Sequence, residues 1–218
     1  MKHFLLASTA GILTAGASFA GGIDRDALNY SILFEEGNYA EIGFSHVAPS
    51  VQGTYPAGLG GGSTGDMAED YTTFSLSYKH QFSDRLHLAL FINSPYGANA
   101  AYTEGAYTGL NATWDSKQIA GVLRYEVTPS VSVYGGLRYV RSEAEIEIPA
   151  LLLAGNSYSA SGSTEDVGYI IGAAFEKPEI ALRVALTYEG AIDQSFPTLE
   201  TSAIVGGTLN STTEVTLP

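Results

Sequence analysis

The sequence has no cysteine, which excludes disulfide bonds, thiolate zinc sites and cysteine nucleophiles. Charged residues are scarce, at 15%, and the net charge is −13. A nucleic-acid-binding protein needs cations that neutralise phosphates, so this balance argues against that class. Outside the N-terminus no apolar run approaches the roughly 18 residues that a membrane helix needs. The absences therefore exclude a helical membrane protein and predict no cofactor or metal.

The N-terminus has the three parts of a secretory signal peptide. Residues 1–3 are a short basic start, residues 4–17 form an apolar and small-residue run, and residues 18–20 read small-x-small. A buried first helix would not need these parts in this order, so we predict a signal peptide over residues 1–20 that is removed after export.

Residues 114–140, WDSKQIAGVLRYEVTPSVSVYGGLRYV, show the clearest pattern in the chain. Apolar and polar positions alternate with a period of two on both sides of a short turn at residues 128–130, which predicts two strands. Each arm has about ten residues, the length of a tilted strand that crosses a bilayer. Tyr125 and Tyr139 fall near strand ends, where aromatic rings favour the headgroup region. The segment therefore predicts a transmembrane β-hairpin.

The same alternation predicts further strands at residues 39–48, 71–79, 86–93, 169–175 and 180–189, and the start of one at 209–217. Short turns near residues 83, 129 and 178 alternate with long loops at 49–70, 96–112, 141–166 and 190–208. Bacterial outer-membrane barrels have this up-and-down pattern, with short periplasmic turns and long external loops. A soluble β-sandwich also alternates, but its strands average only about 5–6 residues. We therefore predict an all-β, antiparallel, up-and-down transmembrane β-barrel in a Gram-negative outer membrane.

The domain organisation follows from these segments. Residues 21–38 mix glycine, charge and a small apolar cluster, and form either an N-terminal hatch inside the barrel or a lead-in to the first strand. Residues 39–218 contain about seven or eight strands. A bacterial barrel needs an even number of strands with every edge paired, and the chain ends on proline without a terminal aromatic strand. We expect a truncated piece, the N-terminal half of a longer barrel; an eight-strand barrel is the competing interpretation.

Four segments carry a family resemblance: ILFEEGNYAEIGFSHVAPSVQG, FINSPYG, residues 114–140 and EKPEIALRVALTYEGAI. Together they make the chain resemble the FadL/TodX-type outer-membrane transporters of long-chain fatty acids and other hydrophobic compounds. The resemblance implies a fourteen-stranded barrel with a hatch, external capture of a hydrophobic small-molecule ligand, and lateral release at a kink in the third strand. Pro95 and Gly97 lie in that strand and can interrupt its pairing.

Three groups of residues are candidates for ligand binding, and each has an alternative interpretation. Apolar residues in the expected loop 141–166 can form a capture surface, or pack within the loop or extend a strand: Ile146, Ile148, Leu151, Leu152 and Leu153. Phe91 and Tyr134 face the expected lumen, where they line an apolar path or pack against the hatch. Arg124, Arg138 and Arg183 also face inward and can bind a carboxylate ligand, or pair with Glu41, Glu126 or Glu189.

Other functions fit the sequence less well. A barrel lipase needs a serine, a histidine and an orienting acid together, and His46, His80 and His87 show no such motif, so no catalytic residues are predicted. A general diffusion porin and a structural or adhesive barrel are the rivals to a transporter. The expected partners are outer-membrane lipid, lipopolysaccharide and the hydrophobic ligand, and the barrel is expected to be a monomer.

Overall fold

The computed structural model describes residues 23–202 and 206–217, so the predicted signal peptide at residues 1–20 lies outside the described residues. The described chain consists of β-strands and short 3-10 helices. None of its helices is long and apolar enough to cross a membrane. The strands are β1 (Tyr39–Val47), β2 (Gln52–Thr54), β3 (Ser63–Asp66), β4 (Tyr71–Gln81), β5 (Leu86–Asn93), β6 (Gly97–Ala101), β7 (Asn111–Thr128), β8 (Val131–Ile148), β9 (Tyr158–Lys177), β10 (Leu182–Glu189), β11 (Ile192–Ser202) and β12 (Gly207–Leu217). The 3-10 helices are η1 (Tyr30–Phe34), η2 (Ala57–Leu59), η3 (Gly105–Tyr107), η4 (Ala150–Leu153) and η5 (Pro178–Ile180).

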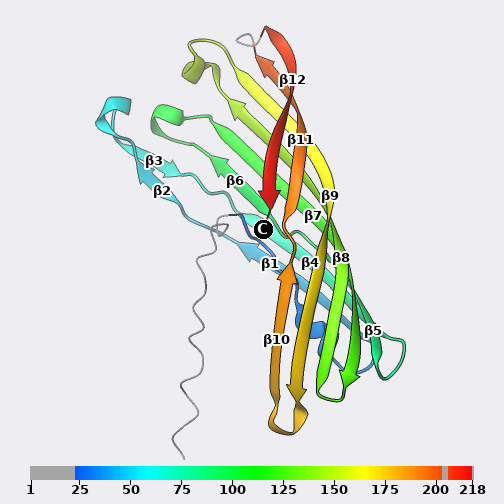
Figure 1. The fold of residues 1–218 in the computed structure, drawn as a ribbon. Coiled ribbons are helices and arrows are strands. Elements are labelled where there is room, and N and C mark those ends of the chain that lie inside the picture. Colours follow the sequence, from blue (N-terminus) through cyan, green and yellow to red (C-terminus); the bar gives the residue numbers. More distant parts are fainter. Residues whose placement is uncertain (1–22, 203–205, 218) are drawn as a thin grey trace, which may run out of the picture.

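Ten strands form one antiparallel sheet in the order β1-β4-β5-β7-β8-β9-β11-β12, in which β6 pairs with β7 and β10 pairs with β9. We call this sheet the wall and each crossing of it by the chain a pass. β5 and β6 are two parts of one pass, and β10 and β11 are two parts of another (Figure 1). β2 and β3 form a separate two-stranded hairpin. Successive passes lie side by side and alternate in direction, so the predicted all-β, antiparallel, up-and-down fold class is confirmed.

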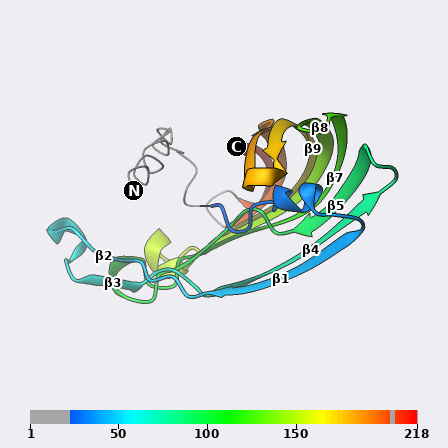
Figure 2. The same ribbon diagram turned by 90° about the horizontal axis from the view of Figure 1, so that it is seen from below.

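The sheet is curved, and the N-terminal segment lies on its concave side (Figure 2). We call this side the inner face and the convex side the outer face. Ile32 and Leu33 in η1 are fully buried, and they belong to the largest apolar cluster, which the inner sides of β5, β7, β8 and β9 complete. The chain from Ile23 to Asn38 therefore packs against the wall, although its assignment as a separate hatch stays a prediction.

The prediction of loops at residues 141–166 and 190–208 is wrong for most of their length. β8 continues to Ile148 and β9 starts at Tyr158, so only a short turn with η4 joins them. β11 occupies most of the second range. Pro197 is tolerated inside β11 because pairing with β9 begins only at the next residue, Thr198, and a proline lacks the N–H that a second neighbour would need. The expected loops at 49–70 and 96–112 likewise contain β2, β3 and β6.

The predicted alternation of faces is confirmed in the lower part of the wall, the part below β11 in Figure 1. Its outer face exposes a band of large apolar side chains on neighbouring strands, among them Ile42, Phe44, Phe74, Leu90, Leu123, Val133, Leu137, Ile171, Val184 and Leu186. On β8 the band runs from Val131 to Tyr139, which is roughly 26 Å along a strand and roughly 20 Å along the axis at a tilt of about 40°. The apolar band of an outer-membrane barrel is about 25 Å tall.

The outer face changes from apolar to charged along one line that crosses three strands. Ile119, Tyr139 and Val167 are register partners and mark the upper end of the apolar band. The next outward positions on the same strands are also register partners, and all three are charged: Lys117, Arg141 and Glu165. Above this boundary the outer face of β8 carries Glu143, Glu145 and Glu147, all exposed.

Candidate functional site

Above the boundary the polarity of the sheet is inverted, so that the inner face becomes apolar. Because side chains alternate between faces, the acidic outward positions of β8 leave Ala144, Ile146 and Ile148 pointing inward. Their register partners on β7, β9 and β11 continue the inner surface in two neighbouring rows: Trp114, Ala144, Gly162 and Thr198; and Ala112, Ile146, Ala160 and Glu200.

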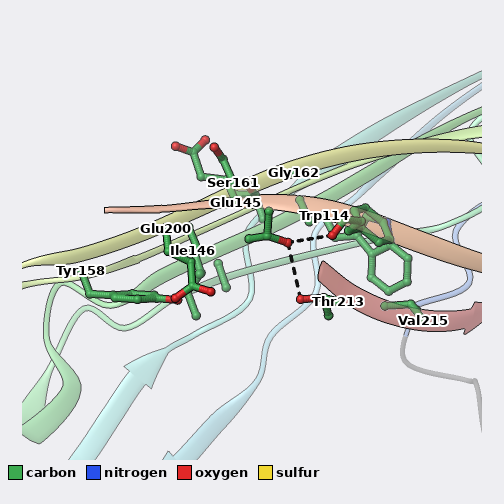
Figure 3. A pocket seen from close by; sticks show the side chains of 15 residues that line it. Trp114, Glu145, Ile146, Tyr158, Ser161, Gly162, Glu200, Thr213 and Val215 are labelled. Atoms are coloured by element: carbon green, nitrogen blue, oxygen red, sulfur yellow. Dashed lines mark hydrogen bonds between the residues drawn. The ribbon is translucent and has the colours of Figure 1, made fainter. Parts of the chain in front are cut away.

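These rows line a pocket with a volume of about 350 Å³ (Figure 3), within the range of small-molecule sites. Trp114 and Phe196 meet edge to face with ring centroids 6.4 Å apart, and Ile146 and Val215 add aliphatic surface. We call this cavity the upper pocket. It can hold a hydrophobic molecule, since its walls are mostly aliphatic and aromatic.

One polar pair lies in the wall of the upper pocket. The Tyr158 hydroxyl donates a hydrogen bond of 3.0 Å to the Glu200 carboxylate. Hydrogen bonds from the side chains of Ser211 and Tyr158 hold the pKa of Glu200 below its usual range, because they stabilise the ionised carboxylate. Glu200 therefore contributes a fixed negative charge to the pocket at neutral pH.

A second site is an interruption in the wall between β4 and β6. β4 pairs with β5 only from Leu76 to Gln81. Among the described residues β6 forms a ladder with β7, and on its other side it has only a single bridge, between Ala100 and Ala68, with the segment that precedes β4. The upper half of β4 and the facing edge of β6 therefore have no ladder between them. Pro95, predicted to break the third strand, lies in the segment that separates β5 from β6, and Gly97 is the first residue of β6.

The N-terminal segment takes the place of the missing ladder partner. The Gly97 N–H donates to the Ile23 carbonyl at 2.8 Å, and the Arg25 N–H donates to the Pro95 carbonyl at 2.8 Å. The Asn93 side-chain amide also donates to the Asp26 carbonyl at 2.6 Å. Residues of the N-terminal segment are thus held along the interrupted strand by backbone and side-chain hydrogen bonds.

The Arg25 side chain joins the two sides of the interruption. Its guanidinium donates to Asp115 on β7 at 2.7 Å and to Asn99 on β6 at 3.0 Å. It also lies over the Tyr71 ring of β4, 4.4 Å from the centroid. A Cβ at Gly97 would collide with the guanidinium, so an alanine there would displace the Arg25 side chain. We call the contacts of Arg25 with Asp115, Asn99 and Tyr71 the Arg25 clamp. Around the clamp lies a cavity of about 370 Å³ that is lined by residues of β4, β6 and the N-terminal segment.

Lower on the inner face, the predicted lumen residues Phe91 and Tyr134 contact η1. The Tyr30 ring lies 5.9 Å from Phe91 and 6.3 Å from Tyr134, and Phe34 meets Tyr134 edge to face at 6.1 Å. The Tyr30 hydroxyl donates to Glu189 at 2.8 Å. These contacts match the alternative interpretation, in which both residues pack against the N-terminal segment.

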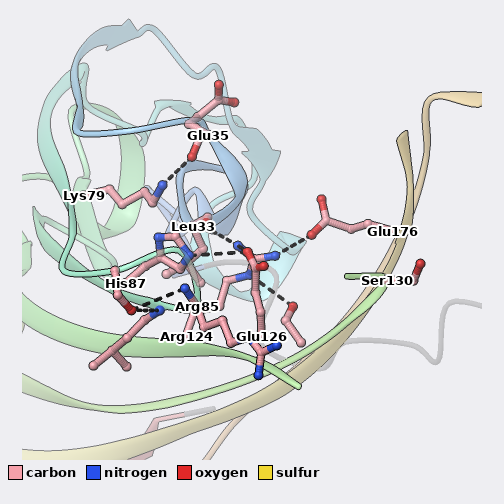
Figure 4. Close-up of polar contacts among 12 residues, drawn as sticks. Leu33, Glu35, Lys79, Arg85, His87, Arg124, Glu126, Ser130 and Glu176 are labelled. Atoms are coloured by element: carbon pink, nitrogen blue, oxygen red, sulfur yellow. Dashed lines mark hydrogen bonds and ion pairs between the residues drawn. The ribbon is translucent and has the colours of Figure 1, made fainter. Parts of the chain in front are cut away.

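Cations from the wall hold the same segment in place (Figure 4). Lys79 donates to the carbonyls of Glu35 and Gly37, the latter at 3.0 Å. The guanidinium of Arg124 lies 4.6 Å from the Phe34 ring centroid, and that of Arg183 lies 4.5 Å from it. Since cations over aromatic faces are favourable, η1 is bound by electrostatic as well as apolar contacts.

The three inward arginines all have carboxylate partners. Arg124 pairs with Glu126 at 2.9 Å and Glu176 at 2.6 Å. Arg183 pairs with Glu176 at 2.9 Å. Arg138 pairs with Glu189 at 2.9 Å. Fixed ion pairs therefore occupy these arginines, as the second interpretation of the sequence expected, and their role in ligand binding stays a prediction.

The predicted capture residues are only partly brought together. Ile146 lines the upper pocket, whereas Ile148, Leu152 and Leu153 are not among the residues around it. Leu151 lies in η4, and its side chain is outside the described part of the structure. The sequence analysis missed Trp114, Ala160, Phe196 and Arg25. The alternation of glutamate with Ala144, Ile146 and Ile148 was the available signal for the pocket, while no pattern pointed to Arg25.

Comparison with solved structures supports the fold. The chain is similar to the crystal structure of a Pseudomonas aeruginosa FadL homologue, with a TM-score of 0.58 and 11% sequence identity. The similarity covers 82% of this chain and 53% of that one, so the chain spans about half the length of that protein. No family model and no curated protein matches the sequence.

Proposed function

We propose that the chain is part of an outer-membrane transport protein that takes up long-chain fatty acids or other hydrophobic small molecules. The observation that carries the proposal is the inversion of polarity along β7, β8 and β9. The lower outer face suits lipid, and the upper inner face forms an apolar pocket above it. A wall strand with both features is suited to receive a hydrophobic molecule outside the membrane and to pass it along the inner face.

The outer face suits two membrane partners. The exposed apolar band would contact outer-membrane lipid, because apolar outward residues flanked by aromatic rings are typical of membrane barrels. Above the boundary the charged outer face would lie among the polar groups of lipopolysaccharide. The Gram-negative outer membrane is therefore the proposed location of the chain.

The two ends of the transport route would be the upper pocket and the interruption beside Arg25. Capture in the upper pocket removes the ligand from water, and the cavity around Arg25 lies where the wall lacks a continuous ladder. We place lateral release at this interruption. The packing of η1 against Phe91 and Tyr134 favours this route over a general diffusion porin, since it fills part of the inner face with side chains.

Uptake by Gram-negative cells tests the proposal. Cells producing the protein should accumulate a radiolabelled hydrophobic compound faster than cells without it. Ala144→Phe should remove most of the gain, because the new ring would fill space between Trp114 and Gly162 in the upper pocket. The matched control is Ala185→Phe, an exposed position on β10 away from the pocket. Equal uptake by Ala144→Phe and Ala185→Phe cells at equal surface amounts would refute the role of the pocket.

A further inference from the structure

The chemistry of the upper pocket narrows its ligand to one charge class. The structure has fifteen residues around the pocket. Among these described residues none is Lys, Arg or His. Glu200 is the acid whose side chain lies on the inner face with the pocket, whereas the Glu145 side chain points to the outer face. The pocket therefore combines apolar walls with negative charge and has no cation to receive an anionic group.

Neighbouring residues do not supply the missing cation. Lys117 and Arg141 lie at the boundary and face outward, and Arg141 already pairs with Glu143 at 2.9 Å. Asp115 and Glu143 line a second cavity on the outer face of the same strands, so their carboxylates are separated from the pocket by the sheet. An anion in the upper pocket would thus meet the Glu200 carboxylate and no compensating cation among the described residues that line it.

The cations lower on the inner face are also committed. Arg124, Arg138 and Arg183 are held by carboxylates at 2.9 Å or less. Lys79 is held by backbone carbonyls of the N-terminal segment. A carboxylate ligand could gain one of these partners only by displacing an existing ion pair or hydrogen bond, which leaves another buried charge unmatched.

From this arrangement we propose that the upper pocket selects uncharged hydrophobic molecules, such as aromatic hydrocarbons or long-chain alcohols, over hydrophobic carboxylates. The inference rests on the proposed uptake function and restricts its substrate class. A carboxylate about 6 Å from a fixed glutamate, at an effective dielectric constant of about 20, is bound about a hundredfold more weakly than a neutral group. Solvent at the open side of the pocket reduces this, so we expect at least about a tenfold difference.

The sequence provides a direct reporter, because Trp114 is the only tryptophan among the 218 residues and lies in the pocket wall. The test uses the full-length protein, with any tryptophan outside these 218 residues replaced by phenylalanine, purified from outer membranes in detergent at pH 8. Energy transfer from Trp114 to the neutral fluorophore N-phenyl-1-naphthylamine measures occupancy. Displacement by 1-dodecanol is then compared with displacement by dodecanoate, which has the same chain length and an ionised head group.

We expect 1-dodecanol to displace the fluorophore at a concentration at least about ten times lower than dodecanoate. In Glu200→Gln, dodecanoate should displace the fluorophore at a concentration at least about threefold lower than in the parent protein, because the repulsion of the anion is removed. The concentration of 1-dodecanol that is needed should not change. Equal or stronger displacement by dodecanoate in the parent protein would overturn the charge selection and leave the uptake proposal standing.

Failure of the uptake proposal gives a different result. Energy transfer that is the same in the parent protein and in Ala144→Phe, with no displacement by either competitor, would mean that the fluorophore binds elsewhere, for example in the micelle. Ala185→Phe should behave as the parent protein in every measurement, and an effect of the same size in this control would count against specific binding in the pocket.

Discussion

Removal of the Arg25 side chain should release the N-terminal segment from the interrupted wall. The Arg25 side chain is 8% exposed, and its guanidinium donates to Asp115 and Asn99. Hydrogen bonds to charged groups contribute about 1.5–3 kcal/mol when buried, but Asp115 is 64% exposed, so we count about 1 kcal/mol for this pair. The Tyr71 contact and the Asn99 hydrogen bond add about 1–2 kcal/mol together. Arg25→Ala should therefore favour opening by about 2–3 kcal/mol.

The absence of cysteine from the sequence makes this opening measurable by thiol labelling. In an Ile23→Cys background, the thiol would lie on the N-terminal segment beside Tyr96, Val140 and Ile192, and a maleimide would reach it when the segment detaches. A change of about 2–3 kcal/mol in the free energy of opening, in favour of the open state, corresponds to labelling about 30 to 140 times faster. Gly97→Ala should also speed labelling, because its Cβ would displace the guanidinium.

Two further variants determine whether the effect comes from the Arg25 contacts. Arg25→Lys keeps the charge but cannot form the forked pair of hydrogen bonds, so its labelling rate should lie between those of the parent and Arg25→Ala. Arg141→Ala removes an ion pair whose side chains are 54% and 62% exposed, and it should change the rate less than about threefold. A labelling rate for Arg25→Ala within about twofold of the parent would refute the clamp.

Three other predictions follow from the fold and the pocket. Ile32→Ala should lower the free energy of unfolding by about 2–4 kcal/mol in urea titrations of vesicle-refolded protein, because Ile32 is fully buried and leaves a cavity. Leu123→Lys should lower the free energy of unfolding by about 2–4 kcal/mol in the same assay. Ser163→Lys, on the outer face above the boundary, should lower it by less than about 0.5 kcal/mol. Equal losses in the two variants would contradict a lipid-facing band. The hydrogen bonds that lower the pKa of Glu200 give stability that is present above its unfolded-state pKa and is lost as the pH falls through the lowered value, so the urea midpoints of the parent and Glu200→Gln should converge on acidification.

The sequence predicted the lower wall well because two physical requirements coincide there. Lipid outside and packed side chains inside force opposite polarity onto neighbouring residues, and Leu123 and Arg124 show this alternation directly. A period of two is also the geometric period of a strand. Strand positions and faces could therefore be inferred without any knowledge of the partner strands.

The upper wall and the Arg25 clamp could not be inferred in the same way. For Ile146 and Ile148 the sequence leaves a capture surface, packing within a loop and extension of a strand open, and in the structure β8 extends to Ile148. The pocket that Ile146 lines depends on the neighbouring strands, which the local pattern does not reveal. Arg25 contacts Asp115, 90 residues away in the sequence, and depends on a missing ladder that local periodicity does not reveal. Contacts made through an interruption in a sheet require the register of the whole wall.

The register of β7, β8 and β9 also explains how one strand can serve both surfaces. The alternation of side chains does not change at the boundary, since Tyr139 and Arg141 both point outward. Only the assignment of apolar and polar residues to the two faces is exchanged. In the proposed route, a hydrophobic molecule that leaves the upper pocket would stay on the same inner face and would meet a polar and ion-paired surface below, where Gln118 and Arg138 are buried. Lateral exit at the interruption beside Gly97, which pairs with Asp115 just above the boundary, would avoid that polar stretch. This is the physical reason to connect the upper pocket with the Arg25 clamp.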